Sequence, residues 1–453
     1  MDIDTKNFLN TQNKPKSNTD TIYFDYENIV SSEKLHQFLF DYFYKYKRVT
    51  WIKDNEEELF CQGLQSTINK YNKHRLLVGF LDKFFLKWYS PKSSLGNSGQ
   101  DLPAQAGKKK ILFRLFKYYD IILGAKKYHQ VGLIVHARDR LFAIKNLMGY
   151  IITSDLDQHV LAYLQEKNIK YLYRLIKEVE NKLGAVKPNY IVLWNDIFPI
   201  ERAIVLASKK LGITTLEIQH GVYDSFRTME TGKVVDHVLV WGEYFKDLYV
   251  KQGKRKPEDI YVLGYPYVIP KNQDVENKDS HYVVCYLGQD LEIYDKNFLS
   301  IKFETANSIY KICKKLGLAF VYRPHPGDDR KALEEKLPHI YFTPAQEKLE
   351  ETFKKADIFI SFQSTSLVEA AMRSKISLQL LNYPLKSDNF EKLSACNASL
   401  QTLEELENYL KKIVSAKKLD ELKIEFNNNY VETRYNPVER FLEIIHEIEK
   451  SKE

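Results

Sequence analysis

Short apolar segments typical of strands alternate with longer amphipathic segments typical of helices through the second half of the chain. The predicted strands are Tyr282–Leu287, Ala319–Arg323, Ile340–Phe342 and Ile358–Ser361, and the predicted helices are Asn297–Leu316, Asp329–Lys336, Lys348–Lys355 and Leu367–Ser374. Strands that alternate with helices form parallel sheets covered by helices on both faces. The pattern therefore predicts a doubly wound α/β domain in this half.

The first half contains a second unit of the same kind. Its clearest part is a strand at Tyr190–Trp194, a helix at Glu201–Leu211 and a strand at Thr214–Ile218. A chain of 453 residues is also too long for one ordinary core. We therefore expect two Rossmann-like doubly wound α/β domains that face each other across a cleft.

The expected domain boundaries follow from the polar segments of the sequence. Residues 1–20 form a polar lead-in, and the polar stretch 270–280 separates the two domains. The first domain is expected at residues 21–270 and the second at 281–430. A helix in the remaining residues, 431–453, is expected to return to the first domain.

Composition indicates a soluble globular protein, because 44% of the residues are hydrophobic and 28% are charged. The cysteines Cys61, Cys285, Cys313 and Cys396 lack CxxC spacing, which argues against a disulfide framework or a metal knuckle. The N-terminal residues contain no apolar core of a secretory signal, and no apolar run is long enough to span a bilayer. The expected location is the cytoplasm.

The net charge is +7, and basic residues gather between residues 108 and 127 around an apolar and aromatic stretch. One interpretation is a basic amphipathic helix that lies on anionic lipid, at the inner face of the cytoplasmic membrane. The other is a core-facing helix with a solvated basic face. Nucleic acid is not an expected partner, since no DNA- or RNA-binding motif is present.

The predicted strand Ala319–Arg323 runs into a turn that contains Pro324, His325 and Pro326. The prolines stiffen this turn and can fix Arg323 and His325 toward one edge of the sheet. A cationic or hydrogen-bonding pair there can neutralise a phosphate leaving group without a metal ion. The turn therefore predicts a phosphate site, and the alternative is a rigid strand-to-helix turn without a ligand.

Hydroxyl side chains at Ser364, Thr365 and Ser366 follow the predicted strand Ile358–Ser361. The amides and hydroxyls at the start of a helix attract anions, so this run also predicts phosphate binding. The alternative is simple capping, because Ser366 and Glu369 have the spacing of a capping box. We expect the two runs at the same edge of one sheet, which favours a binding site.

In the first domain, the sequence Gln219-His220-Gly221 follows a predicted strand. His220 can accept a proton near neutral pH, as a base that activates an acceptor hydroxyl must do. Asp196 and Glu201 lie in the neighbouring loop and at the start of the next helix. Either carboxylate can orient His220 or act as the base itself, so all three residues are candidates, with helix capping as the alternative for Asp196.

These segments resemble a family of enzymes. Together with VWGEYFKDLYVKQG (residues 240–253), GYP (264–266) and SFQSTSLVEA (361–370), they are similar in order and spacing to bacterial GT-B glycosyltransferases of surface polysaccharide assembly. The resemblance covers about residues 185–390. It is nearest to capsule and lipopolysaccharide transferases that use CMP-activated acidic sugars, such as sialyltransferases and Kdo transferases.

The resemblance implies a function and a set of donor-binding residues. The chain would move a sugar, such as a sialic-acid-like or Kdo residue, from a nucleotide donor to a glycan or lipid-linked glycan acceptor. Glu369 would reach the ribose of the donor, and His220 would take the place of an acidic base. The residues expected to bind the donor phosphate are Arg323, His325, Pro326, Ser364, Thr365 and Ser366. No DxD motif follows a strand, in keeping with a reaction that needs no metal.

Three other functions stay open at the level of the sequence. A UDP-sugar 2-epimerase has a similar pair of domains and a similar phosphate site, but it needs no acceptor. A CDP-polyol phosphotransferase differs in its CDP-linked donor. A non-catalytic scaffold could use residues 108–127 to recruit a polysaccharide complex to the membrane.

Overall fold

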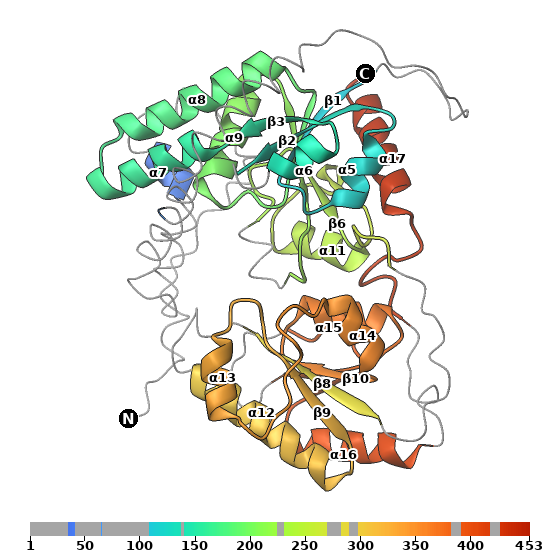
Figure 1. Cartoon of the computed structure of the whole chain (residues 1–453). Helices are drawn as coiled ribbons and strands as arrows, with labels where there is room; N and C mark the ends of the chain where they lie inside the picture. The colour runs from blue at the N-terminus through green and yellow to red at the C-terminus, as the bar shows by residue number, and fades with distance from the viewer. Residues whose placement is uncertain are drawn as a thin grey trace, which may run out of the picture.

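The computed structural model describes residues 35–40, 65, 108–136, 140–223, 231–269, 282–289, 298–381, 391–416 and 426–453. These residues form two parallel β-sheets covered by helices, one above the other in Figure 1. The predicted class, two doubly wound α/β domains, is confirmed. The polar lead-in predicted at residues 1–20 lies outside the described residues.

The first sheet has seven strands in the order β3-β2-β1-β4-β5-β6-β7. In chain order they are β1 (Lys110–Arg114), β2 (Gln130–Val135), β3 (Gly149–Ile152), β4 (Tyr190–Leu193), β5 (Thr214–Ile218), β6 (His237–Val240) and β7 (Ile260–Val262). The chain winds outward from β1 to β3 and then restarts on the other side at β4. The strand order therefore reverses between β1 and β4, where doubly wound sheets open a crevice beyond their carboxyl ends.

Helices cover both faces of this sheet, because its central strands are apolar on both sides. Ile111 and Phe113 of β1 enter the core beneath α5 and α17, whereas Leu112 enters the core beneath α8 and α9. This alternation is the two-residue period of a strand that is buried on both faces. The helices of the first domain are α5 (Tyr119–Ala125), α6 (Arg140–Lys145), α7 (Ser154–Glu166), α8 (Lys170–Val186), α9 (Pro199–Lys210), α11 (Glu243–Lys251) and α17 (Pro437–Lys450), with a 3₁₀ turn at Pro257–Asp259.

The single basic helix predicted within residues 108–127 is wrong. Its first part is β1, which pairs with both β2 and β4 in the middle of the sheet, and only Tyr119–Ala125 is helical. A short apolar run such as Ile111–Phe113 fits a buried parallel strand as well as a helix, and here burial on two faces decided the outcome. Of the apolar residues in this stretch, Ile111–Phe113 and Tyr118 are buried, whereas Phe116 and Tyr119 are exposed at 37% and 50%. The expected membrane contact therefore loses the helix on which it was based and stays a prediction.

The second sheet has five strands in the order β12-β11-β10-β8-β9, and its strand order reverses between β8 and β10. The strands are β8 (Val283–Leu287), β9 (Ala319–Arg323), β10 (Ile358–Ser361), β11 (Ile376–Leu380) and β12 (Ala398–Leu400). The helices are α12 (Phe298–Lys315), α13 (Arg330–Lys336), α14 (Leu349–Lys355), α15 (Thr365–Met372) and α16 (Leu403–Ser415). The strand predicted at Ile340–Phe342 makes only an isolated bridge to β9.

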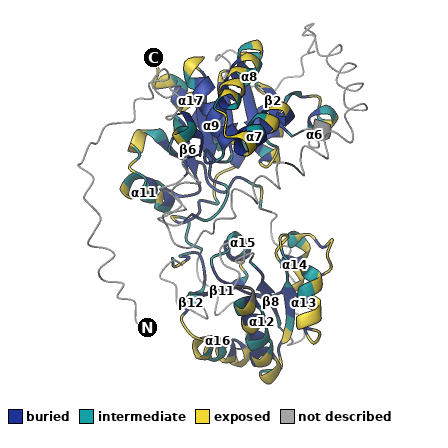
Figure 2. Ribbon diagram, turned by 90° about the vertical axis from the view of Figure 1, so that its left-hand side faces the viewer, coloured by how far each residue is buried: buried dark blue, intermediate teal, exposed yellow. Residues whose placement is uncertain are grey.

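Burial follows these layers, with buried strands inside and exposed faces on the outer helices (Figure 2). Figure 1 shows α14 and α15 on the side of the second domain that is nearer to the first. Among the described residues, no helix combines the length and apolar character needed to cross a membrane.

The end of the chain returns to the first domain, where α17 packs against α5 (Figure 1). The segment before α17 passes so close to Gly242 that a larger residue at this position would clash with it. A β-carbon added at Gly242 would lie 2.5 Å from the carbonyl oxygen of Tyr430 and 2.6 Å from that of Asn429. The glycine of the WGEYF sequence therefore makes room for the returning backbone.

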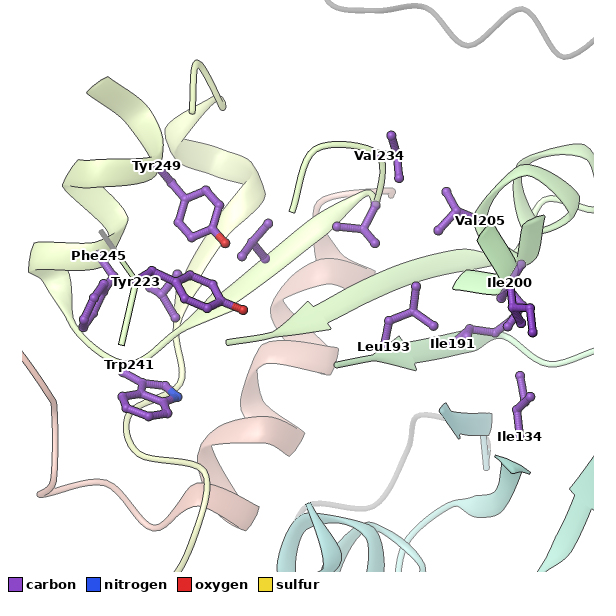
Figure 3. Packing of buried hydrophobic residues seen from close by; sticks show 14 of the residues in the cluster. Ile134, Ile191, Leu193, Ile200, Val205, Tyr223, Val234, Trp241, Phe245 and Tyr249 are labelled. Carbon is purple, nitrogen blue, oxygen red and sulfur yellow. The ribbon is translucent and has the colours of Figure 1, made fainter. Parts of the chain in front are cut away.

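The largest apolar cluster includes residues of both domains. Figure 3 shows its first-domain part, where aliphatic side chains such as Ile191 and Ile200 lie between β4 and α9. The rings of Tyr223, Trp241 and Tyr249 lie at the carboxyl ends of the strands (Figure 3). The cluster continues into the second domain through α15, so the carboxyl ends of the first sheet are packed toward that helix.

Candidate functional site

The turn after β9 is held by a buried ion pair. Asp328 accepts a hydrogen bond from the Lys302 ammonium, and both side chains are almost fully buried, at 1% and 3% exposure. The other carboxylate oxygen accepts from the backbone N–H of His325 at 2.7 Å. His325 itself is exposed. Its Nδ1 accepts from the N–H of Gly327 at 3.1 Å, so the neutral imidazole carries its proton on Nε2. The turn therefore presents a fixed N–H donor to the surface.

Unlike His325, Arg323 does not present its side chain to the surface. Its guanidinium donates to the hydroxyl of Thr352 at 2.7 Å and to the carbonyl of Glu347 at 3.0 Å. Thr352 donates in turn to the Glu347 carboxylate at 2.8 Å. The structure thus uses Arg323 to fix the segment before α14, whereas His325 is presented to solvent.

The point where the strand order reverses, between β8 and β10, lies between the two predicted phosphate-binding runs. Gln289, just after β8, donates from its side-chain amide to the carbonyl of Gln363 at 2.7 Å. Ser361, at the end of β10, donates to the carbonyl of Leu287 at 2.8 Å. These bonds join the loops at the reversal point of the sheet, where doubly wound proteins hold their ligands.

The hydroxyl run lies at the N-terminus of α15. Ser364 is the N-cap residue, but its side chain makes no capping hydrogen bond. The helix begins at Thr365, so the capping box expected from Ser366 and Glu369 is not formed; both residues are inside the helix. The hydroxyls of this run are therefore not needed to cap α15, which leaves the anion-attracting end of a helix at the edge of the sheet.

The Gln219-His220-Gly221 turn of the first domain is rigidly built. The side chain of Gln219 is fully buried and donates to the carbonyl of Gly221 at 2.8 Å. Its other side-chain atom, Oε1, accepts from the N–H of Trp241 at 2.9 Å, while its backbone carbonyl accepts from the Trp241 indole at 2.8 Å. The glutamine of this motif thus locks the position of the histidine that follows.

His220 is partly exposed between two aromatic rings. Its Nδ1 lies 2.6 Å from the hydroxyl of Tyr223, and the edge of its ring meets Trp194 at a centroid distance of 5.1 Å. When Nδ1–H donates to the tyrosine oxygen, the lone pair of the neutral imidazole is on Nε2. This is the tautomer that a general base requires.

Two polar contacts bring the domains together at this point. The hydroxyl of Thr365 accepts a hydrogen bond from the N–H of Val222 at 3.1 Å. Glu369 accepts a hydrogen bond from the hydroxyl of Tyr265, which belongs to the GYP sequence of the first domain. Burial raises the pKa of Glu369, which the nearby Arg373 and the tyrosine bond partly offset. The histidine turn therefore lies directly against the N-terminus of α15.

Asp196, the second candidate base, is fully buried and already bonded. Its two oxygens accept from the backbone N–H groups of Gly232 and Val234 at 2.9 and 2.7 Å. The buried Glu217 is beside it, and burial together with the charge of Asp196 raises the pKa of Glu217 well above its usual value. The hydrogen bonds of Asp196 therefore hold residues 231–234 in place.

Glu201, the third candidate base, forms a buried ion pair. The guanidinium Nε of Arg114 donates to its carboxylate at 2.8 Å, and the two side chains are 3% and 4% exposed. Arg114 also contacts His136, whose Nδ1 is 3.3 Å from the carboxylate of Asp157. Glu201 is therefore part of a charged network inside the first domain.

The structure thus sets the turn of His220 against Thr365 at the start of α15. Ser364 is the N-cap residue of this helix, and Ser366 and Glu369 lie within it. His325 lies two strands away at the same edge, whereas Asp196, Glu201 and Arg323 are engaged elsewhere. Pro326 is exposed in the turn after His325. Sequence reasoning missed Tyr223, Tyr265 and Gln289, since each owes its importance to a contact with a residue distant in sequence or across a turn.

Two doubly wound sheets with their polar loops at the carboxyl edges, and a C-terminal helix that returns to the first domain, define a fold of the GT-B type. No protein-family model matches the sequence, and no curated protein matches it. Solved structures do share its fold.

Several of these structures are UDP-GlcNAc 2-epimerases. A putative enzyme from Listeria monocytogenes has a TM-score of 0.54 and 12% identity over 77% of this chain and 97% of its own. The enzyme from Methanocaldococcus jannaschii has a TM-score of 0.50 and 17% identity over 74% and 99%. That from Neisseria meningitidis, solved with UDP-GlcNAc, has a TM-score of 0.50 and 15% identity over 75% and 100%. Similarity at this level of identity establishes the fold.

Proposed function

We propose that the protein is a glycosyltransferase of the GT-B type, which transfers a sugar from a nucleotide donor to a glycan acceptor of the cell surface. One observation carries this proposal. The Thr365–Val222 hydrogen bond sets the histidine turn of the first domain against the N-terminus of α15 in the second. A candidate base and a candidate phosphate site therefore meet at the carboxyl edges of two sheets, as a transfer between two bound substrates requires.

The second domain would bind the donor. The exposed His325 would donate from Nε2 to a phosphate oxygen, while the amides and hydroxyls at the start of α15 would hold the remaining negative charge. Charge develops on this phosphate as the bond to the sugar breaks, so donors fixed beforehand lower the barrier. We propose that these groups, rather than a metal ion, stabilise the leaving nucleotide.

The first domain would bind the acceptor and supply the base. The acceptor hydroxyl attacks the anomeric carbon of the sugar, and its proton passes to Nε2 of His220. The bond between the anomeric carbon and the phosphate oxygen breaks, and the nucleotide leaves with the electron pair. A hydrogen bond donated by Nδ1–H to the oxygen of Tyr223 would keep the imidazole in the tautomer that accepts this proton.

The finer form of the proposal concerns the substrates. The resemblance of the motifs favours a CMP-activated acidic sugar as donor, and a glycan or lipid-linked glycan of capsule or lipopolysaccharide as acceptor. Packing of the two domains against each other would exclude water, which otherwise hydrolyses an activated sugar.

The replacement His325→Ala tests the donor site. We expect it to weaken nucleotide binding by about tenfold, because it removes a hydrogen bond to a charged group, and to lower turnover at the same time. Binding is measured as the rise in melting temperature caused by CMP, CDP, UDP, GDP or ADP.

His339→Ala is the matched control, since His339 is also exposed and its ring contacts the side chain of Asn307, away from the turn. This control should bind nucleotide as the unmodified protein does. If none of the five nucleotides raises the melting temperature, or if His325→Ala binds them normally, the proposed donor site is refuted.

A UDP-sugar 2-epimerase is the second candidate, and the fold of the three similar structures favours it. Incubation with a nucleotide sugar alone distinguishes the two functions. An epimerase would convert the donor into its 2-epimer without an acceptor, whereas the transferase would leave the sugar ring unchanged.

A further inference from the structure

A lysine stands at the reversal point of the first sheet. Lys117 belongs to the turn that joins β1 to α5, and its ammonium lies 3.7 Å from the centre of the Trp194 ring, just after β4. β1 and β4 are the strands between which the strand order reverses. Lys117 and Trp194 therefore lie at the position where doubly wound sheets bind ligands.

The turn that carries Lys117 is anchored on both sides. Before it, the N–H of Leu115 donates to the carbonyl of Ile134 at 2.9 Å, with Leu115 in the left-handed region at a φ of 65°. After it, the hydroxyl of Tyr118 donates to the carbonyl of Ile218 at 2.7 Å. A side chain between two such anchors is held where it can meet a ligand at little further entropic cost.

Lys117 has no ion-pair partner in the part of the chain that the structure describes, since no carboxylate there lies within ion-pair distance of its ammonium. Glu201 is the carboxylate that influences it, but Glu201 is bound to Arg114 at 2.8 Å. Burial of the ammonium over the indole lowers the pKa of Lys117. The Lys117 side chain is nevertheless exposed, so its ammonium can reach a negatively charged group of a bound ligand.

Lys117 is also next to the proposed chemistry. The Trp194 ring that it covers meets the edge of His220 at 5.1 Å between centroids. The proposed phosphate site lies in the second domain, whereas Lys117 lies in the first. A negative group bound at Lys117 would therefore be a different group of the substrate from the phosphate. It would lie on the side of the candidate base, where the sugar is transferred.

We infer that Lys117, held over Trp194, is a specificity-determining residue that binds a carboxylate on the transferred sugar. This inference rests on the proposed function and deepens it, since it makes the donor an acidic nucleotide sugar. The carboxylate would accept a hydrogen bond from the ammonium, while the nucleotide phosphates would be held separately at His325 and α15.

Matched donors that differ in one carboxylate test this inference. The pairs are UDP-glucuronate with UDP-glucose, GDP-mannuronate with GDP-mannose, and CMP-N-acetylneuraminate with its methyl ester. The dissociation constant of each is measured by titration calorimetry, together with those of UDP, GDP and CMP. For at least one pair, the protein should bind the acidic member about tenfold more tightly than the neutral one, as a hydrogen bond between charged groups allows.

Lys117→Met should remove this preference by weakening the acidic member about tenfold, while leaving the neutral member and the free nucleotide within about twofold. Lys117→Arg should keep most of the preference, because it retains the charge. Lys127→Met, which removes an exposed charge at the end of α5, is the control and should change nothing.

Equal affinity for both members of every pair would overturn the inference, as would equal weakening of both by Lys117→Met. In either case free nucleotides still bind, so the proposed function would survive. Absence of binding by all three free nucleotides would overturn the proposed function and this inference together.

Discussion

Breaking the ion pair between Lys302 and Asp328 should destabilise the second domain by several kilocalories per mole. Replacing Lys302 by Met keeps most of the volume of the side chain but removes its charge, which leaves the carboxylate of Asp328 buried at 1% exposure without a counter-ion. Breaking a buried pair in this way costs about 3–5 kcal/mol of unfolding free energy. In a domain of about 150 residues, that loss lowers the melting temperature by roughly 6–20 °C.

Far-UV circular dichroism is the suitable assay, with unfolding by heat and by urea. All four tryptophans precede residue 242, so intrinsic fluorescence would report mainly on the first domain. The matched control is Lys331→Met, which removes an exposed lysine paired at 3.9 Å with Glu335. This control should change stability by less than about 0.5 kcal/mol.

A second variant separates loss of charge balance from loss of packing. In the double variant Lys302→Met, Asp328→Asn, the buried carboxylate is gone, and part of the lost stability should return. A loss below about 1 kcal/mol for Lys302→Met would mean that the pair behaves as an exposed one. The argument that it fixes the turn of His325 would then be refuted.

Two further predictions concern the first domain. Burial and the charge of Asp196 raise the pKa of Glu217 above 4.5, so the folded state binds this proton more tightly than the unfolded chain does. The stabilisation that protonated Glu217 gives is therefore fully present below the pKa of Glu217 in the unfolded chain, and it is lost as the pH rises through the pKa of the folded state. Between about pH 5 and pH 8, Glu217→Gln should therefore lose less unfolding free energy than the unmodified protein, as measured by urea titrations. Gly242→Ala should cost about 1–3 kcal/mol by calorimetry, because its methyl group would meet the carbonyl of Tyr430, whereas Gly184→Ala, with open space around it, should not destabilise. A pH profile unchanged by Glu217→Gln, or equal melting of the two alanine variants, would contradict these arguments.

The order of strands and helices was predictable because it depends on local patterns. The apolar run at Ile358–Ser361 and the helix that follows it are encoded by residues within one segment. The misassigned stretch was Ile111–Phe113, because a run of three apolar residues has too little periodicity to distinguish a helix from a strand. This stretch is a strand because it pairs with β2 and β4, and that pairing involves residues up to about 80 positions away.

The candidate site was predictable only in part for a similar reason. Strand ends marked His220, His325 and the start of α15, since polar residues after buried strands gather at one edge of a sheet. The chemical state of a carboxylate, however, depends on its partners in space. Nothing near Glu201 in the sequence indicates that Arg114 pairs with it, and nothing near Lys117 indicates that it would lie over Trp194.

The path of the chain makes the second domain an insertion within the first. The outgoing chain at Tyr265 and the incoming chain at Glu432 run side by side, joined by a hydrogen bond of 2.9 Å from the amide of Tyr265 to the carbonyl of Glu432. Both connections therefore leave the first domain from a single place. A domain attached in this way can be exchanged as a cassette between residues 269 and 426, and under the proposed function such an exchange would alter the choice of nucleotide while the first domain stays intact.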